Sequence, residues 1–216
     1  MQSCFGPTVC MINIACVYKD QKYSEDWVDR LYRGVERNIT VDFNFHCISN
    51  RQTKYNTIPL QLDSDGYWNK VELFRKDLFD GPVLYFDLDV VICNDITPMI
   101  KSCTDSKLYM AEEPYRSIHN SSVMLWNQDY SNLYDNYVTN QTDVVREYQD
   151  ITRQGALGDQ AYISENIEHN IIDHKYISWE HHKMKTNYVD PTVLIFTGSK
   201  KPNLNQHLDV VKDNWI

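Results

Sequence analysis

The first part of the chain changes its hydrophobic period twice, and each change predicts a different element. Residues 11–17, with the sequence MINIACV, form an apolar run of strand length. After a polar break, Ser24 and two acidic residues precede apolar positions at helical spacing, and we expect a helix that Ser24 caps. Residues 41–47 then alternate between apolar and polar, as strands do. The order strand, helix, strand is typical of the start of an α/β sheet.

The later elements follow a less regular pattern. Helix-compatible spacing covers residues 67–79, and a Gly-Pro pair ends it just before VLYFDLDVVIC, which predicts one buried central strand over 83–93. No internal repeat, low-complexity tract or linker marks a boundary, so we expect a single α/β domain over residues 1–216. The second half predicts a strand at 122–126, two helical stretches within 130–149 and a helix over 159–167.

Composition agrees with one globular domain and narrows the range of partners. The 216 residues are 42% hydrophobic and 24% charged, the balance of an ordinary globular protein. Thirty acidic against 21 basic residues give a net charge of -9, which excludes nucleic acid as the main partner. An anionic ligand would also be repelled on average, so its site must contain a metal ion or a few well-placed Lys and Arg residues.

The six cysteines predict reduced thiols rather than disulfides. They form no Cys-x-x-Cys pair, and Cys16, Cys47 and Cys93 lie in apolar runs where cysteine is usually a small buried hydrophobe. The N-terminus does not resemble a signal peptide, and no stretch approaches the roughly 20 apolar residues of a transmembrane segment. We therefore expect a soluble, cytoplasmic protein.

Two aspartates at the end of an apolar run are the main candidate for chemistry. Carboxylates such as Asp87 and Asp89 in YFDLDVV lose water when they are buried and need a compensating charge, for which a divalent cation is the usual choice. Mg²⁺ and Mn²⁺ take carboxylate oxygens and bridge to substrate phosphates, and the carboxyl ends of strands are where open α/β sheets bind ligands. The two acids could instead simply point into solvent, because a two-residue pattern is common by chance.

A phosphatase of the haloacid dehalogenase type would carry a similar motif. In that class Asp-x-Asp normally follows the first strand, whereas here a complete strand-helix-strand-helix unit comes before it. The later acidic pair of that class has no clear match, since Gly158-Asp159-Gln160 continues as AYIS. Both differences count against a phosphatase.

Four motifs in order along the chain resemble those of the GT-A glycosyltransferases of family 8, which include glycogenin and the bacterial lipooligosaccharide galactosyltransferases. The motifs are VLYFDLDVVICNDITPM, HNSSVMLWN, GDQAYIS and LIFTGSKKPN, and the resemblance runs from Asn13 to Asn203. It implies a single Rossmann-like GT-A domain with a mostly parallel mixed sheet flanked by helices. It also implies transfer of a hexose from a nucleotide-diphosphate sugar, most simply UDP-linked, to an acceptor hydroxyl, with Mn²⁺ or Mg²⁺ as cofactor. The acceptor (a glycan, a protein or a small molecule) stays undefined, because acceptor pockets are built from variable loops.

By this resemblance, the first motif holds the metal and part of the donor. Asp87 would contact the donor ribose and the metal, and Asp89 would bind the metal directly. The family places a basic residue on the preceding helix to hold the donor, and Lys70 stands at the matching position, with Arg75 as second choice. A solvated helix lysine is the plain alternative for Lys70.

The next two motifs imply residues that face the transferred sugar. Asn120 would hydrogen-bond sugar hydroxyls, and the small Ser121 and Ser122 would allow close approach of a ligand. Asp159 would bind donor or acceptor hydroxyls, and Gln160 would sit near the anomeric carbon. Because an amide is a poor nucleophile, we expect no covalent role for Gln160 but retention of configuration, with the leaving phosphate assisting the incoming hydroxyl.

The last motif implies a loop that closes on the diphosphate. Gly198 would permit close backbone approach, and Lys201 would neutralise charge on the leaving group. For the nucleotide base the resemblance implies the end of the first strand, from Ala15 to Tyr18, and the following Tyr23.

One departure from the family concerns the metal. Many members carry a histidine ligand three residues before the glycine of the last motif, where this chain has Ile195. His207 is a candidate third ligand, with His181-His182 also nearby in sequence, although diphosphate and water can complete octahedral coordination without a histidine. The departure leaves open a non-catalytic protein that binds nucleotide-sugars.

Overall fold

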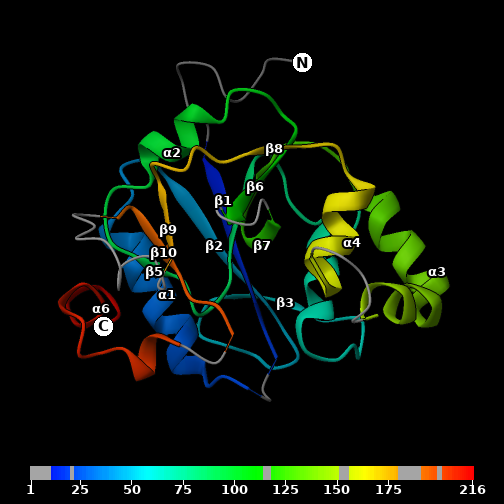
Figure 1. Cartoon of the computed structure of the whole chain (residues 1–216), viewed down its shortest axis with the longest axis horizontal. Helices are drawn as coiled ribbons and strands as arrows, with labels where there is room; N and C mark the ends of the chain where they lie inside the picture. The colour runs from blue at the N-terminus through cyan, green and yellow to red at the C-terminus, as the bar shows by residue number, and fades with distance from the viewer. Residues whose placement is uncertain (1–10, 20–21, 114–117, 151–155, 180–190, 199–200) are drawn as a thin grey trace.

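A computed structural model describes residues 11–19, 22–113, 118–150, 156–179, 191–198 and 201–216. Strands lie at its centre, α1 and α6 lie on one side of them, and α3 and α4 lie on the other (Figure 1). The strands are β1 (Ile12–Tyr18), β2 (Phe43–Ser49), β3 (Asn56–Pro59), β4 (Val83–Phe86), β5 (Val91–Ile92), β6 (Leu108–Glu113), β7 (Ile118–Trp126), β8 (His169–Ile171), β9 (Ile177–Trp179) and β10 (Val193–Ile195). The helices are α1 (Glu25–Arg37), α2 (Thr97–Ser102), α3 (Ser131–Tyr148), α4 (Gly158–Asn166) and α6 (Asp209–Asn214), with the 3₁₀ segments η1 (Gly66–Phe74) and η2 (Pro202–Leu204).

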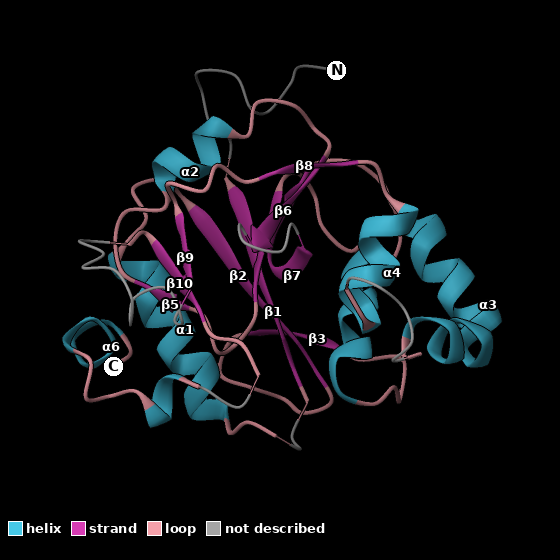
Figure 2. Ribbon diagram, in the orientation of Figure 1, coloured by secondary structure: helices cyan, strands magenta, loops and turns pink. Residues whose placement is uncertain are grey.

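The main sheet is mixed and mostly parallel, as predicted. Its seven strands run in the order β3-β2-β1-β4-β7-β6-β8 (Figure 2). β3, β2, β1 and β4 pair in parallel, β7 is antiparallel to both β4 and β6, and β8 is parallel to β6. A second sheet contains β5, β10 and β9. The parallel half gathers the carboxyl ends of β1 and β4 at one edge, where α/β sheets bind ligands.

Two hydrophobic cores cover the two faces of the main sheet, and β1 contributes to both. Ile12, Ile14 and Cys16 belong to the core that α1 and the second sheet cover. Ala15, between them in sequence, belongs to the core that η1, α3 and α4 cover. Successive strand residues point to opposite faces, so an almost wholly apolar strand is what a sheet covered on both sides requires.

The predicted strand over residues 83–93 is wrong as one element, because the chain changes sheets within it. β4 ends at Phe86, and the Asp87 N–H still bonds the Ser122 carbonyl oxygen of β7 at 2.9 Å. The Val90 N–H then bonds the Asp87 carbonyl at 3.2 Å and closes a turn, after which β5 pairs with β10. The whole run is apolar because both sheets are buried, and the turn between them carries Asp87 and Asp89.

Two helical predictions also need revision, and a third is confirmed. The helix expected over 67–79 is the 3₁₀ segment η1, which ends at Phe74 because Arg75 is extended (ψ 142°) and Asp77 has a left-handed φ of 56°. Ser24 stands at the N-cap of α1, but its side chain makes no capping hydrogen bond. The two helical stretches expected within 130–149 are present as α3, joined at a non-helical Asn140.

The cysteine prediction is confirmed for most of the described positions. Cys16, Cys47 and Cys103 are buried free thiols, whereas Cys93 is only half-buried. Cys4 and Cys10 lie outside the described residues. Among the helices of the described chain, none combines the length and the apolar character that crossing a bilayer requires.

Candidate active site

A cavity of about 620 Å³ opens at the carboxyl edge of the main sheet, and most of the predicted site residues line it. Asp87 and Asp89 lie in the turn after β4, Asn120 lies on β7, and Lys70 lies on η1. Asp159 and Gln160 lie in the first turn of α4. Predicted residues on the wall of this cavity are Tyr23, Lys70, Asp87, Asp89, Asn120, Asp159, Gln160, Gly198 and Lys201.

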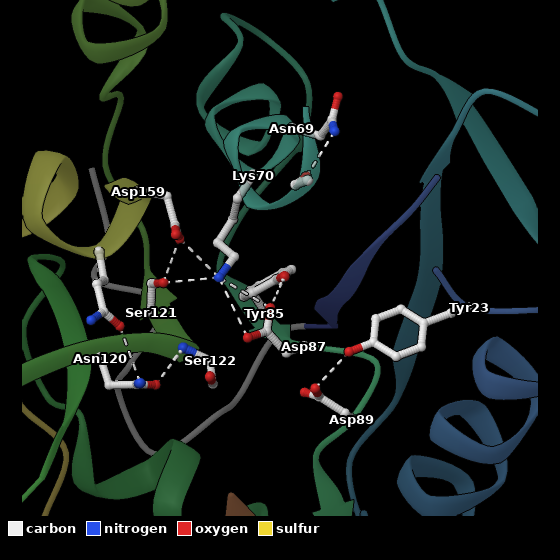
Figure 3. Close-up of polar contacts among 12 residues, drawn as sticks. Tyr23, Asn69, Lys70, Tyr85, Asp87, Asp89, Asn120, Ser121, Ser122 and Asp159 are labelled. Carbon is white, nitrogen blue, oxygen red and sulfur yellow. Dashed lines mark hydrogen bonds and ion pairs between the residues drawn. The ribbon is translucent and has the colours of Figure 1, made fainter. Parts of the chain in front are cut away.

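The floor of the cavity is a buried ion-pair network around Lys70 (Figure 3). Its ammonium lies 3.1 Å from Asp87 Oδ1 and 2.9 Å from Asp159 Oδ2. It also donates to Ser121 Oγ at 2.8 Å, and Ser121 Oγ donates to Asp159 Oδ2 at 2.6 Å. Lys70 is only 6% exposed, so it is no solvated helix lysine. The Lys70 ammonium therefore joins four elements, namely η1, β7, α4 and the turn that follows β4.

The electrostatics of this network favour the charged forms of Lys70 and Asp87. Burial by itself lowers the pKa of Lys70, but the charges of Asp159 and Asp87 outweigh it and raise that pKa above its ordinary value. Burial raises the pKa of Asp87, but Lys70 and hydrogen bonds from Tyr85 and Ser122 outweigh it and hold that pKa below its ordinary value. The ion pair thus stays formed across the physiological pH range.

Asp89 has a separate set of partners. The Tyr23 hydroxyl donates to its Oδ2 at 2.7 Å, and the Lys201 ammonium contacts the same oxygen. Burial and the Asp89 charge raise the pKa of Tyr23, so its hydroxyl stays a proton donor. The aromatic residue expected at the nucleotide base therefore also holds a carboxylate of the acidic motif.

Tyr85 and Ser121 have roles in the network that the sequence did not predict. The Tyr85 hydroxyl donates to Asp87 Oδ1 at 2.5 Å. The sequence could have indicated this contact, because Tyr85 lies two residues before Asp87 and strand residues at i and i+2 share a face. Ser121 was expected only to leave room for a ligand, whereas its hydroxyl links Lys70 to Asp159.

A second pair of polar side chains lies beside this network. Asn120 Nδ2 donates to Gln160 Oε1 at 3.2 Å, and Asn120 Oδ1 accepts the Ser122 N–H at 2.8 Å. The first of these bonds joins β7 to the first turn of α4. Together the two bonds fix two amides on the cavity wall, where each can turn a further donor or acceptor toward a hydroxyl-rich ligand.

Several predicted residues lie away from the cavity wall. Ala15 is fully buried and Tyr18 is 3% exposed, both within the cores. His207 is exposed and does not line the cavity. The Arg75 guanidinium bonds the Pro59 carbonyl at 3.1 Å instead. His181 and His182 lie outside the described residues.

The two aspartates supply carboxylate oxygens, the ligands that a hard cation prefers, but these oxygens fill only part of its coordination sphere. Both present carboxylate oxygens to the cavity, and both are now neutralised by ammonium groups, so a positive charge suits each position. Within the described parts of the chain, no cluster of three or more His, Cys, Asp or Glu side chains could hold a metal ion. Ile195, at the family's histidine position, is buried in β10. A bound cation would need ligand oxygens from a substrate or water.

Gly158, just before Asp159, allows the close approach of α4 to η1. Its φ is +67°, and a Cβ there would lie 2.4 Å from Tyr67 Cε2. We expect Gly158→Ala to lower the free energy of unfolding by about 1–3 kcal/mol, because the methyl group adds a clash to left-handed strain. Chemical denaturation measures this change.

A control variant separates the steric clash from the backbone strain. Gly81 has a φ of +92°, and a Cβ there would meet no atom within 4 Å. Gly81→Ala therefore carries the strain without the clash and should destabilise less. Equal effects in the two variants would contradict the contact between Gly158 and Tyr67.

Comparison with known proteins supports the fold. No protein-family model matches this chain, and no curated protein matches its sequence. Among solved structures, the galactosyltransferase LgtC in complex with donor and acceptor sugar analogs has 14% identity and a TM-score of 0.65, over 94% of this chain and 96% of LgtC. The glycosyltransferase GlyE of Streptococcus pneumoniae TIGR4 has 11% identity and a TM-score of 0.64, over 89% of this chain and 56% of GlyE. Mouse xyloside xylosyltransferase 1 has 12% identity and a TM-score of 0.55, over 88% of this chain and 98% of that protein.

These similarities define the class of fold. The chain has the GT-A fold of glycosyltransferases, as its four motifs predicted. At such low identity the similarity concerns the fold, and activity has to be argued from the site.

Proposed function

We propose that this protein is a metal-dependent hexosyltransferase that uses a nucleotide-diphosphate sugar, most simply a UDP-sugar, and retains the anomeric configuration. The observation that carries the proposal is the pair Asp87 and Asp89, each neutralised by a lysine, on the wall of a cavity of about 620 Å³. A diphosphate brings at least two negative charges, and this edge of the sheet offers cations to receive them.

The acidic motif would hold the cofactor. Asp87 and Asp89 are the protein ligands of Mn²⁺ or Mg²⁺, which when bound supplies a Lewis acid toward the departing diphosphate. Lys201 already lies on Asp89, so its ammonium is within reach of the same phosphates and can neutralise their charge. Gly198 has a left-handed φ of +60° and no side chain, so a ligand can approach its backbone closely. Val17, Lys19 and Tyr23 line the part of the cavity nearest the end of β1, where we place the nucleoside.

The amides would orient the sugar. Gln160 and Asn120 hold each other and offer their remaining hydrogen-bonding groups to hydroxyls of the transferred hexose. Asp159 is 5% exposed and paired with Lys70, so we assign it the positioning of Lys70 rather than direct contact with a sugar. Gln160 forms no covalent intermediate. The acceptor hydroxyl attacks the anomeric carbon on the face from which the phosphate departs, and the leaving phosphate takes the proton of that hydroxyl.

Binding of nucleotide together with metal is the first test. At UDP concentrations near 100 times the dissociation constant, ligand binding adds about 2.7 kcal/mol to the free energy of unfolding. For a chain of this size that corresponds to a rise in melting temperature of about 5–10 °C. We expect the rise with UDP and MnCl₂ together and a much smaller one with MnCl₂ alone or with UDP and EDTA.

Turnover distinguishes an enzyme from a binding protein. A panel of UDP-sugars and GDP-mannose, assayed for released nucleotide, should show one preferred donor that is cleaved slowly by water and faster with an acceptor. Stabilisation by UDP and Mn²⁺ without release from any donor would indicate a non-catalytic binder. Phosphate release from simple phosphomonoesters would instead indicate a phosphatase.

A further inference from the structure

The rim of the cavity has a basic part and an apolar part. One part of the rim surrounds Asp89: Lys201 contacts this carboxylate, and the exposed Lys22 has its ammonium 4.9 Å from the ring centroid of Tyr23, which bonds the same carboxylate. Elsewhere it carries Tyr67, 47% exposed, and Leu157, 36% exposed, which are large apolar side chains open to solvent. The basic part suits an anion, and the apolar part suits an uncharged molecule.

Tyr67 is held in place by its surroundings. It lies three residues before Lys70 on η1, and in a 3₁₀ helix residues at i and i+3 lie on the same face. Its ring packs against the backbone of Gly158, where an added Cβ would come within 2.4 Å of Cε2. Its hydroxyl accepts a hydrogen bond from Gln149 Nε2 of the segment after α3, at 3.3 Å. The ring is therefore preset, and it remains half-exposed beside the cavity.

The position of the ring relative to the reacting groups limits what it can bind. Gly158, on which it packs, is followed directly by Asp159 and Gln160, and Leu157 precedes it. A molecule resting on Tyr67 and Leu157 thus lies next to Gln160, the residue assigned to the transferred sugar, whereas Lys201, the cation expected at the diphosphate, contacts Asp89. This is the place of the second substrate, the acceptor.

We propose that Tyr67 determines acceptor binding by providing a flat platform for a pyranose ring of the acceptor. A pyranose presents a face of C–H groups that packs on an aromatic face, while its hydroxyls stay free for the Gln160 amide and for transfer. This proposal rests on the proposed glycosyltransferase function and adds that the acceptor is itself a sugar bound through its ring face.

The test compares Tyr67→Ala, Tyr67→Leu and Tyr67→Phe in the full chain. Saturation-transfer NMR with UDP and MnCl₂ present would measure binding of methyl β-D-galactopyranoside, methyl β-D-glucopyranoside and lactose, with glycerol as a polyol that has no ring. We expect at least one pyranoside to bind the wild type, and its affinity to fall about three- to tenfold in Tyr67→Ala and Tyr67→Leu. Tyr67→Phe keeps the platform and should retain binding, and glycerol should show no difference among the variants.

Controls separate this inference from the proposed function. Tyr134→Ala removes a partly buried tyrosine of α3 that does not line the cavity and should leave pyranoside binding unchanged. The affinity for UDP with Mn²⁺ should be equal in wild type and all Tyr67 variants. If UDP binds but pyranosides bind wild type and Tyr67→Ala equally, or bind neither, the platform is refuted while the donor site stands. Weaker UDP binding in Tyr67→Ala would assign the ring to the nucleotide and also refute it, and a wild type that binds no UDP refutes the proposed function itself.

Discussion

Asp89→Asn is expected to lower metal-dependent turnover of the donor sugar by about 100-fold or more. Asparagine has nearly the same size and keeps an acceptor oxygen for Tyr23, but it removes the charge that a divalent cation needs. Electrostatic stabilisation of a leaving diphosphate is a large share of catalysis in such reactions, so the loss falls on the rate of transfer. Nucleotide release measures the rate, and Mn²⁺ affinity in the presence of UDP should weaken in parallel.

A matched variant tests whether the effect belongs to the site. Asp143 lies on α3, where it is exposed and paired with Arg146 at 2.6 Å. Asp143→Asn removes the same charge far from the acidic motif, and an exposed pair contributes little to stability, so turnover should be unchanged. Activity of Asp89→Asn within about twofold of wild type would remove Asp89 from the metal site. An inactive Asp89→Asn that binds Mn²⁺ with unchanged affinity would give the residue another role.

The sequence predicted much of this site because its residues follow recognisable local patterns. Asp87 and Asp89 were found at the end of an apolar run, and Lys70 and Gln160 were found through motifs that resemble those of a known family. The cavity brings these residues together although they come from different parts of the chain. Strand ends and helix starts meet at one edge of an α/β sheet, and for that reason local patterns were enough.

The interactions inside the site were not predictable in the same way. Two of the partners of Lys70 are Asp159 and Ser121, 89 and 51 positions further along the chain, so only the folded chain defines these pairs. The same limit explains the split of residues 83–93, because β5 ends its run by pairing with β10, more than 100 residues later. A single sequence shows that a segment is apolar, but it does not show which of two sheets covers it.

The role of Tyr23 shows a second limit. By the family resemblance, this tyrosine would offer an aromatic face to a nucleotide base, yet its hydroxyl donates to Asp89 and links the segment before α1 to the acidic motif. The resemblance to the family implies a position for the ring but gives no information on the hydrogen bond at its tip. Polar ends of long side chains are set by tertiary contacts, which one sequence does not encode locally.

Lys70→Met is expected to destabilise the protein more than any other single change in the site. It removes the ammonium that contacts both Asp87 and Asp159, and breaking a buried ion pair costs about 3–5 kcal/mol because a charge is left uncompensated. The melting temperature should fall by roughly 10 °C, given about 2–4 °C per kcal/mol for a chain of this size. Donor turnover should also be lost, since the turn that carries Asp87 loses its anchor to η1. Lys107→Met is the matched control, because Lys107 and its partner Glu168 are exposed and the change should be near neutral.

The pH dependence of this variant identifies the cause of its instability. In the wild type Lys70 holds the pKa of Asp87 below its ordinary value, so this carboxylate adds stability above about pH 3.9 that is lost as the pH falls through its lowered pKa. Without Lys70, burial dominates and raises the carboxylate pKa, so stability should instead decrease as the pH rises from about 4 toward that raised value. The free energy of unfolding of Lys70→Met should therefore fall further below that of the wild type at pH 8 than at pH 5. Adding Asp159→Asn to Lys70→Met should restore part of the stability but none of the activity. A loss of stability that is equal at both pH values would mean that packing, and not uncompensated charge, explains the effect.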